Sequence, residues 1–162
     1  MKKRNKVIVI AEAGINHNGK LSLAKKLIKE ASKSGADYVK FQTYHLDSMI
    51  VKNTMPTIYQ KKNIKKKISQ YEILKKYRLK DHWYKDLISY SKQNKIKFIS
   101  SPFDIKSIEF LKKFKLDYIK VPSGEINNLP YLKVLGRLKK KTILSTGMSS
   151  LKDVKAAIRI LT

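Results

Sequence analysis

The sequence predicts an α/β fold in which parallel strands alternate with helices. Short runs rich in β-branched and aromatic residues are separated by longer segments whose apolar residues recur every three or four positions. Each strand-like run is followed by a helix-like segment, which implies parallel strands joined by right-handed crossovers. The 162 residues hold five such units, whereas a complete (β/α)8 TIM barrel takes about 250 residues. The chain therefore corresponds to about the first five βα units of a barrel, or to an open doubly wound sheet.

Five segments have the composition of strands, namely residues 7–11, 37–42, 97–100, 117–121 and 142–146. The helices that follow them are expected over residues 21–35, 82–94, 105–114, 131–139 and 151–161. Leu23, Leu27 and Ile28 share one face of the first helix, which Gly35 ends. Residues 44–77 form a long polar excursion, and segments of that length are usually functional lids or disordered.

Lysine dominates the composition. The chain has 37 Lys and Arg against 12 Asp and Glu, a formal net charge of +25. The basic residues are spread along the sequence without a zinc-finger, basic-zipper or RNA-binding motif, so we expect a solvated surface and no nucleic-acid partner. No apolar run reaches membrane length and no cysteine is present, so a membrane partner and disulfides are not expected and the cytoplasm is the default location.

Polar side chains close each predicted strand. They are Glu12, Lys40, Gln42, Ser100, Ser101, Lys120, Ser145 and Thr146. Because side chains alternate along a strand, Lys40 and Gln42 share one face, and Val39 and Phe41 share the other. Both barrels and open parallel sheets place their active sites at the carboxyl ends of the strands, so this polar edge is the expected site.

Two lysines in this set end parallel strands. Lys40 and Lys120, with Ser101 and Ser123 nearby, predict a cationic pocket lined by hydroxyls, suited to a phosphate and a carboxylate on one small molecule. A Schiff-base lysine, as in class I aldolases, is the alternative that the strand pattern leaves open. Glu12 on an inward face needs a partner, and a salt bridge to Lys40 or Lys120 would supply one.

Other polar residues have structural explanations. The glycine-rich turn 11–19 matches neither the dinucleotide-binding nor the Walker spacing. His17, His45 and His82 do not have the spacing of a metal-ligand set. Asp104 is expected to cap a helix, and Tyr131 and Met148 are expected to pack in the interior.

Five segments together resemble a known family: "IAEAGINHNG", "GADYVKFQTY", "FISSPFD", "IKVPSGEINNLPYL" and "ILSTGMS". In this order and spacing they are similar to the sialic acid synthase family, which includes N-acetylneuraminate and legionaminate synthases. The resemblance runs from about residue 7 to residue 162, and it weakly favours the legionaminate branch. It implies a (β/α)8 barrel followed by an antifreeze-like domain. It also implies condensation of phosphoenolpyruvate with an N-acetylmannosamine-type sugar, release of phosphate, and a divalent metal, Mn²⁺ or Mg²⁺.

The resemblance also implies roles for individual residues. Those at positions that bind phosphoenolpyruvate are Lys40, Ser101, Lys120 and Ser123. Those on the sugar side are Gln42, Glu125 and Ser145. Glu12 matches a catalytic carboxylate that assists proton transfer. The family's lysines bind anions and form no imine, which disfavours the aldolase alternative.

The resemblance covers only part of the family's length. Its metal-binding histidines, the remaining strands and the antifreeze-like domain are expected to lie beyond residue 162, so no metal ligand is assigned here. Residues 1–162 are thus expected to be the N-terminal portion of a barrel, incomplete as an enzyme, with a homodimer or a complementing chain as expected assemblies. The alternatives are another phosphoenolpyruvate-dependent sugar-acid synthase, an inactive fragment, or a basic binding protein.

Overall fold

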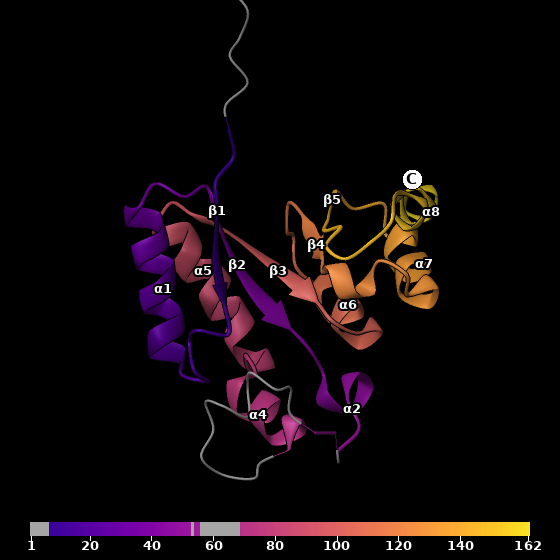
Figure 1. Ribbon diagram of the computed structural model, residues 1–162. Coiled ribbons are helices and arrows are strands. Elements are labelled where there is room, and N and C mark those ends of the chain that lie inside the picture. The colour runs from indigo at the N-terminus through magenta and orange to yellow at the C-terminus, as the bar shows by residue number, and fades with distance from the viewer. Residues whose placement is uncertain (1–6, 53, 56–68) are drawn as a thin grey trace, which may run out of the picture.

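The computed structural model describes residues 7–52, 54–55 and 69–162, and these form one parallel sheet of five strands (Figure 1). The strands are β1 (Ile10–Gly14), β2 (Tyr38–Thr43), β3 (Lys97–Pro102), β4 (Ile119–Val121) and β5 (Thr142–Leu144). Their spatial order is the sequence order, β1-β2-β3-β4-β5, and every neighbouring pair is parallel. A doubly wound sheet reverses its strand order at a switch point, whereas a barrel wall does not. The topology is therefore that of a barrel wall.

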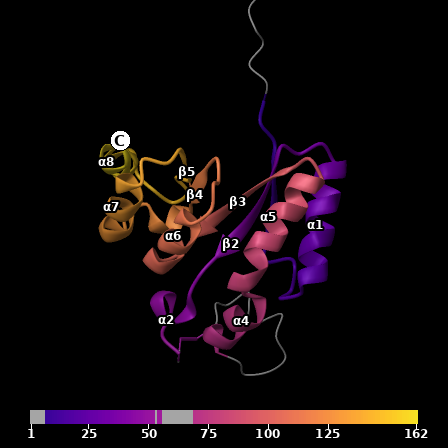
Figure 2. The same cartoon turned by 180° about the vertical axis from the view of Figure 1, so that it is seen from behind.

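Helices cover one face of this sheet. They are α1 (Leu21–Lys33), α5 (Tyr84–Gln93), α6 (Ile105–Lys112), α7 (Leu129–Arg137) and α8 (Leu151–Leu161). Two further helices, α2 (Leu46–Met49) and α4 (Gln70–Tyr77), lie beyond the end of β2 (Figure 1). Two short 3₁₀ turns are η1 (Asp81–Trp83) and η2 (Ser123–Glu125). The sheet lies in front of α5 in Figure 1, and α5 lies in front of the sheet in the reverse view of Figure 2. The opposite face of the sheet is left for the polar side chains.

Strand alternation decides which residues enter the core. Val39 and Phe41 are fully buried on the helix-covered face, where they pack with Ile28 and Leu87 from α1 and α5. A second cluster joins Val121 to α7 and α8. Tyr131 is fully buried and its hydroxyl donates to the Pro102 carbonyl oxygen at 2.9 Å, so its predicted packing role is confirmed.

Several predicted boundaries were wrong. The first strand begins at Ile10 rather than at residue 7, because pairing with β2 begins at Ile10 opposite Tyr38 and Val7 is 79% exposed. Strand β4 begins at Ile119, two residues later than expected. Strand β5 ends at Leu144, since the last bond toward β4 is the Ser145 N–H to the Val121 carbonyl oxygen.

The described part of the excursion after β2 is folded into two helices. It contains α2 and α4, and α4 begins with a capping box between Ser69 and Glu72. Tyr44 fixes α4 against the end of β2 by donating its hydroxyl to the Leu74 carbonyl oxygen at 2.9 Å. Residues 53 and 56–68 of the predicted excursion lie outside the described residues.

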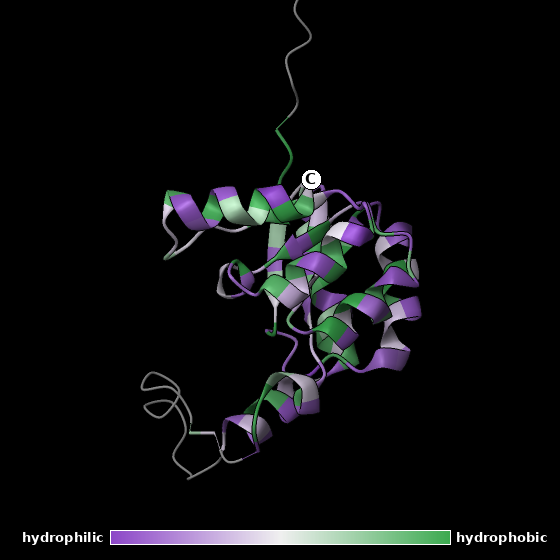
Figure 3. Ribbon diagram, turned by 90° about the vertical axis from the view of Figure 1, so that its right-hand side faces the viewer, coloured by the Kyte–Doolittle hydropathy of each residue, from purple (hydrophilic) through white to green (hydrophobic). Residues whose placement is uncertain are grey.

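Apolar side chains also remain exposed near α8. Met148, predicted to pack, instead lies fully exposed in a left-handed backbone conformation with φ of 54°. Leu151 and Ile158 on α8 are exposed as well, and Figure 3 shows apolar and polar residues interleaved along this helix. In the described part of the chain, no helix has the length and apolar character needed to cross a membrane.

Candidate active site at the carboxyl ends of the strands

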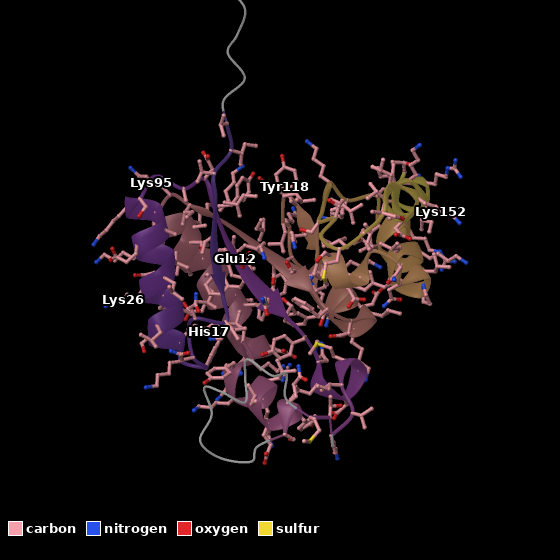
Figure 4. The ribbon with its side chains drawn as sticks, viewed as in Figure 1. Glu12, His17, Lys26, Lys95, Tyr118 and Lys152 are labelled. Carbon is pink, nitrogen blue, oxygen red and sulfur yellow. The ribbon has the colours of Figure 1, made fainter. Side chains whose placement is uncertain are left out.

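Four consecutive strands each contribute a polar side chain to the face that the helices leave open. The register pairs Glu12 of β1 with Lys40 of β2, and Gln42 of β2 with Ser101 of β3. Ser100 pairs with Ile119, so one residue further along each strand Ser101 adjoins Lys120 of β4. Figure 4 shows Glu12 on β1, the first strand of the sheet, beside β2. The row thus runs carboxylate, ammonium, hydroxyl, ammonium.

Lys40 is the anchor of this row. Its ammonium nitrogen lies 2.5 Å from Glu12 Oε2 and donates to Ser101 Oγ at 3.2 Å. Its side chain is 9% exposed, because Val39 and Phe41 hold β2 deep in the sheet. A buried ammonium requires both a counter-charge and hydrogen-bond acceptors, and these two neighbours supply them. The predicted salt bridge of Glu12 is confirmed, with Lys40 as the partner.

Lys120 differs from Lys40 in its charged neighbours. Partial burial lowers the pKa of its ammonium, and the positive charge of Lys40 lowers it further, while Glu12 acts in the opposite direction. Among the described residues Lys120 forms no salt bridge, unlike Lys40. An ammonium without a paired carboxylate, close to a second ammonium, is a strong attractor for an anion.

A glycine shapes the end of β1. Gly14 has φ of 52°, and the pairing of β1 with β2 shifts between Glu12 and Gly14. A Cβ at Gly14 would lie 3.5 Å from Glu12 Oε1 and 3.9 Å from Gln42 Nε2, so Gln42 borders the same space as Glu12. Sequence reasoning missed Gly14, although a glycine at a strand end is a signal for such a bulge.

The comparisons with known proteins extend over nearly the whole chain. The NeuB family model matches residues 27–162. The chain belongs to the NeuB family. It is 46% identical over 156 residues to N,N'-diacetyllegionaminic acid synthase of Campylobacter jejuni, which covers 96% of this chain and 47% of that protein. The corresponding synthase of Legionella pneumophila is 44% identical over 150 residues, with 93% and 42% covered.

A solved structure confirms the fold of this NeuB family chain. The N-acetylneuraminic acid (sialic acid) synthetase of Leptospira borgpetersenii superposes with a TM-score of 0.79 at 28% identity, covering 97% of this chain and 50% of that one. The five βα units therefore form part of a (β/α)8 barrel, and the resemblance to sialic acid synthases is confirmed. The chain spans about half the length of the relatives it matches.

The remaining predicted site residues of the NeuB chain lie in the loops after β4 and β5. Glu125 in η2 accepts a hydrogen bond from Asn128 Nδ2 at 2.7 Å. Ser123 Oγ would lie 3.4 Å from a Cβ at Gly147, so the loops after β4 and β5 are in contact. Ser145 directly follows β5. The structure thus joins five predicted residues in one cluster (Glu12, Lys40, Gln42, Ser101 and Lys120), and puts the other three on two adjoining loops at the same end of the sheet.

Ser100 does not belong with the other strand-end residues. Its hydroxyl donates to the Phe41 carbonyl oxygen at 3.1 Å and lies 2.6 Å from Thr43 Oγ1, on the helix-covered face. Thr43 in turn lies 2.7 Å from the hydroxyl of buried Tyr84. Strand alternation separates Ser100 from Ser101, so only Ser101 faces the lysines.

The histidines do not converge in the NeuB chain. His45 Nδ1 lies 3.1 Å from Ser107 Oγ, and Asp104 caps α6 as predicted by accepting from the Ser107 N–H at 2.8 Å. His82 lies exposed in η1. Over residues 7–52, 54–55 and 69–162, no three His, Cys, Asp or Glu side chains are grouped as metal ligands would be. The described donors therefore do not form a site for the divalent metal that the family resemblance implies.

His17 is buried for a structural reason. Its Nδ1 accepts the Gly19 N–H at 3.1 Å, its ring lies 5.9 Å from that of Phe41, and its Nε2 has no partner in the described structure. In Figure 4 it lies near the lower end of α1, away from Glu12. Burial lowers the pKa of His17 from 6.5 to about 4. The imidazole is therefore neutral in the folded chain at neutral pH.

This buried histidine makes the fold sensitive to acid. Above pH 6.5 both folded and unfolded states hold neutral His17, so no stability is lost. Between pH 6.5 and about 4 only the unfolded state takes up the proton, which costs about 2–3 kcal/mol of unfolding free energy by pH 4.5. Urea unfolding at pH 7.5 and 4.5 should show this loss shrink in His17→Gln and persist in His82→Gln, which changes an exposed histidine. Equal losses in both variants would contradict the assignment.

Proposed function

We propose that this chain provides the phosphoenolpyruvate-binding part of a synthase that condenses phosphoenolpyruvate with an N-acetylmannosamine-type sugar. One observation carries the proposal. Two lysines from β2 and β4 flank the Ser101 hydroxyl at the carboxyl ends of the strands. Two ammonium groups and a hydroxyl at the active end of a barrel suit a small molecule with a phosphate and a carboxylate. The 46% identity to a diacetyllegionaminic acid synthase supports this substrate class.

The proposed reaction gives each residue a task. Lys40, Lys120 and Ser101 hold the two anionic groups of phosphoenolpyruvate, so that C3 of the enol is directed at the aldehyde carbon of the open-chain sugar. A C–C bond forms there and the aldehyde oxygen takes up a proton. Water then adds at C2 and gives one proton to Glu12, which balances the proton taken up by the aldehyde oxygen. The bond between C2 and the phosphate oxygen breaks as the C2 hydroxyl becomes the ketone of the product, and phosphate leaves with the second proton of the water. Fixed ammonium groups stabilise the charge that develops, since they need no reorganisation during the reaction.

A divalent metal is part of the family resemblance, and it would polarise the sugar aldehyde when bound. The described residues offer no ligand set for it, so no step here is assigned to a metal. We further propose that residues 1–162 are the N-terminal portion of the barrel, that the assembly is a homodimer or includes a complementing chain, and that the reaction is cytoplasmic.

The sugar side of the site can be tested separately. Glu125 lies on η2 beyond Lys120, with its carboxylate oriented by Asn128. Glu125→Ala should weaken N-acetylmannosamine binding about tenfold, the loss of one charge-assisted hydrogen bond, and leave phosphoenolpyruvate binding within about twofold. Calorimetric titration with each ligand in turn makes the comparison. Equal weakening for both ligands contradicts the sugar role, and no saturable phosphoenolpyruvate binding by the unaltered chain contradicts the proposed function.

A further inference from the structure

We propose that Glu12 occupies the anion-binding position of the site in the ligand-free protein, and that the anionic substrate must displace it from Lys40. This inference rests on the proposed function, and it assigns Glu12 a second role as an internal competitor that is released on binding. The negative charge that Lys40 holds in the free chain would then be exchanged for a charge on the substrate.

The two partners of the salt bridge differ in how firmly they are held. The Lys40 side chain is 9% exposed and bonded to Ser101 Oγ, so its ammonium is fixed by the sheet. The Glu12 side chain is 57% exposed, and Lys40 is its only salt-bridge partner among the described residues. A side chain so open to water can leave at small cost, since solvent replaces the lost contact. The lysine is therefore the fixed receptor and the carboxylate the exchangeable occupant.

Charge balance favours the exchange. Glu12, Lys40 and Lys120 together carry one negative and two positive charges. Phosphoenolpyruvate brings a carboxylate and a phosphate, so each ammonium group can pair with one anionic group of the ligand. Glu12 beside the bound phosphate would place like charges in contact, which is unfavourable near a partly buried site. Lys40 cannot pair fully with both, and the multiply charged ligand is the stronger partner.

The exchange has a consequence for the proposed reaction. While Glu12 contacts Lys40 at 2.5 Å, the ammonium engages its carboxylate. When the substrate displaces Glu12 from Lys40, the carboxylate oxygens of Glu12 become free to accept a proton from water. Glu12 would therefore become available as a base only after the anionic substrate has bound, which orders binding before proton transfer.

Calorimetric titration with phosphoenolpyruvate and with inorganic phosphate tests the inference. Glu12→Gln removes the competing charge and should lower both dissociation constants about tenfold. Glu30→Gln, which removes an exposed carboxylate on α1 paired with Lys33, should change neither by more than about twofold. Circular dichroism verifies that each variant is folded. Equal or weaker binding by Glu12→Gln overturns the inference and leaves the proposed function standing. If neither the unaltered chain nor Glu12→Gln binds phosphoenolpyruvate, the inference and the proposed function are both overturned.

A measurement on the unaltered chain guards against an effect of the substitution itself. The ¹³C resonance of the Glu12 carboxyl carbon is assigned by its loss in Glu12→Gln. It should shift as phosphoenolpyruvate is added, and the shift should saturate at the same ligand concentrations as the heat of binding in the calorimetric titration. A carboxyl resonance that stays in place while phosphoenolpyruvate binds overturns the displacement.

Discussion

Replacing Lys40 by methionine should lower the affinity for phosphoenolpyruvate about a hundredfold. The change removes a nearly buried ammonium that already holds a carboxylate at 2.5 Å and a hydroxyl at 3.2 Å. A charge-assisted hydrogen bond at such a site contributes about 1.5–3 kcal/mol, and about 2.7 kcal/mol corresponds to a hundredfold change in binding. Methionine keeps most of the volume of the lysine stem, so the packing of β2 is retained.

A matched control separates this local effect from the general charge of the chain. Lys26→Met also removes one positive charge, but from an exposed position on α1 (Figure 4). It should leave the dissociation constant for phosphoenolpyruvate within about twofold, because solvent screens exposed charges. Equal losses in the two variants would show that the anion is attracted by the lysine-rich surface as a whole rather than by the site.

Replacing Gly19 by alanine should have the largest effect on folding. Gly19 has φ of 69°, and a Cβ there would lie 2.1 Å from the backbone oxygen of Lys76 in α4. Neither backbone can yield without separating α4 from the β1–α1 turn. We expect the free energy of unfolding to fall by about 3 kcal/mol or more, from strain plus the clash, as measured by urea denaturation.

Gly35 provides the comparison that isolates the clash. Its φ is 77°, similar to that of Gly19, but a Cβ there would have no neighbour within 4 Å. Gly35→Ala should therefore cost only the left-handed strain, about 1–2 kcal/mol. If the free energy of unfolding falls equally in the two variants, the clash with Lys76 costs nothing beyond the left-handed strain, which contradicts the prediction.

Patterns confined to one segment were predicted well from the sequence. The separation of Lys40 and Gln42 from Val39 and Phe41 follows from the two-residue period of a strand, which depends on no distant contact. The cap at Asp104 is similarly local, because its carboxylate bonds to the N–H of Ser107 in the same helix turn.

Features that depend on contacts between distant segments could not be predicted from the sequence pattern of one segment. Residues 7–9 have the composition of a strand, but the ladder between β1 and β2 begins at Ile10, where β2 offers its first paired residue. His17 lies in a polar turn and is buried only because that turn folds over Phe41. The contact of Gly19 with Lys76 joins residues that are far apart in the sequence.

The alternation of strands and helices and the face that each strand side chain takes follow from the sequence alone, and the family resemblance points to the residues of the site. The pairing of Glu12 with Lys40, and the lack of a salt bridge to Lys120 in the described chain, depend on how the strands are arranged in the folded protein. Both lysines lie on parallel strands, and the two-residue period of a strand does not distinguish one from the other. The register of β1 against β2 distinguishes them, because Glu12 lies directly opposite Lys40, whereas Lys120 lies three strands away on β4.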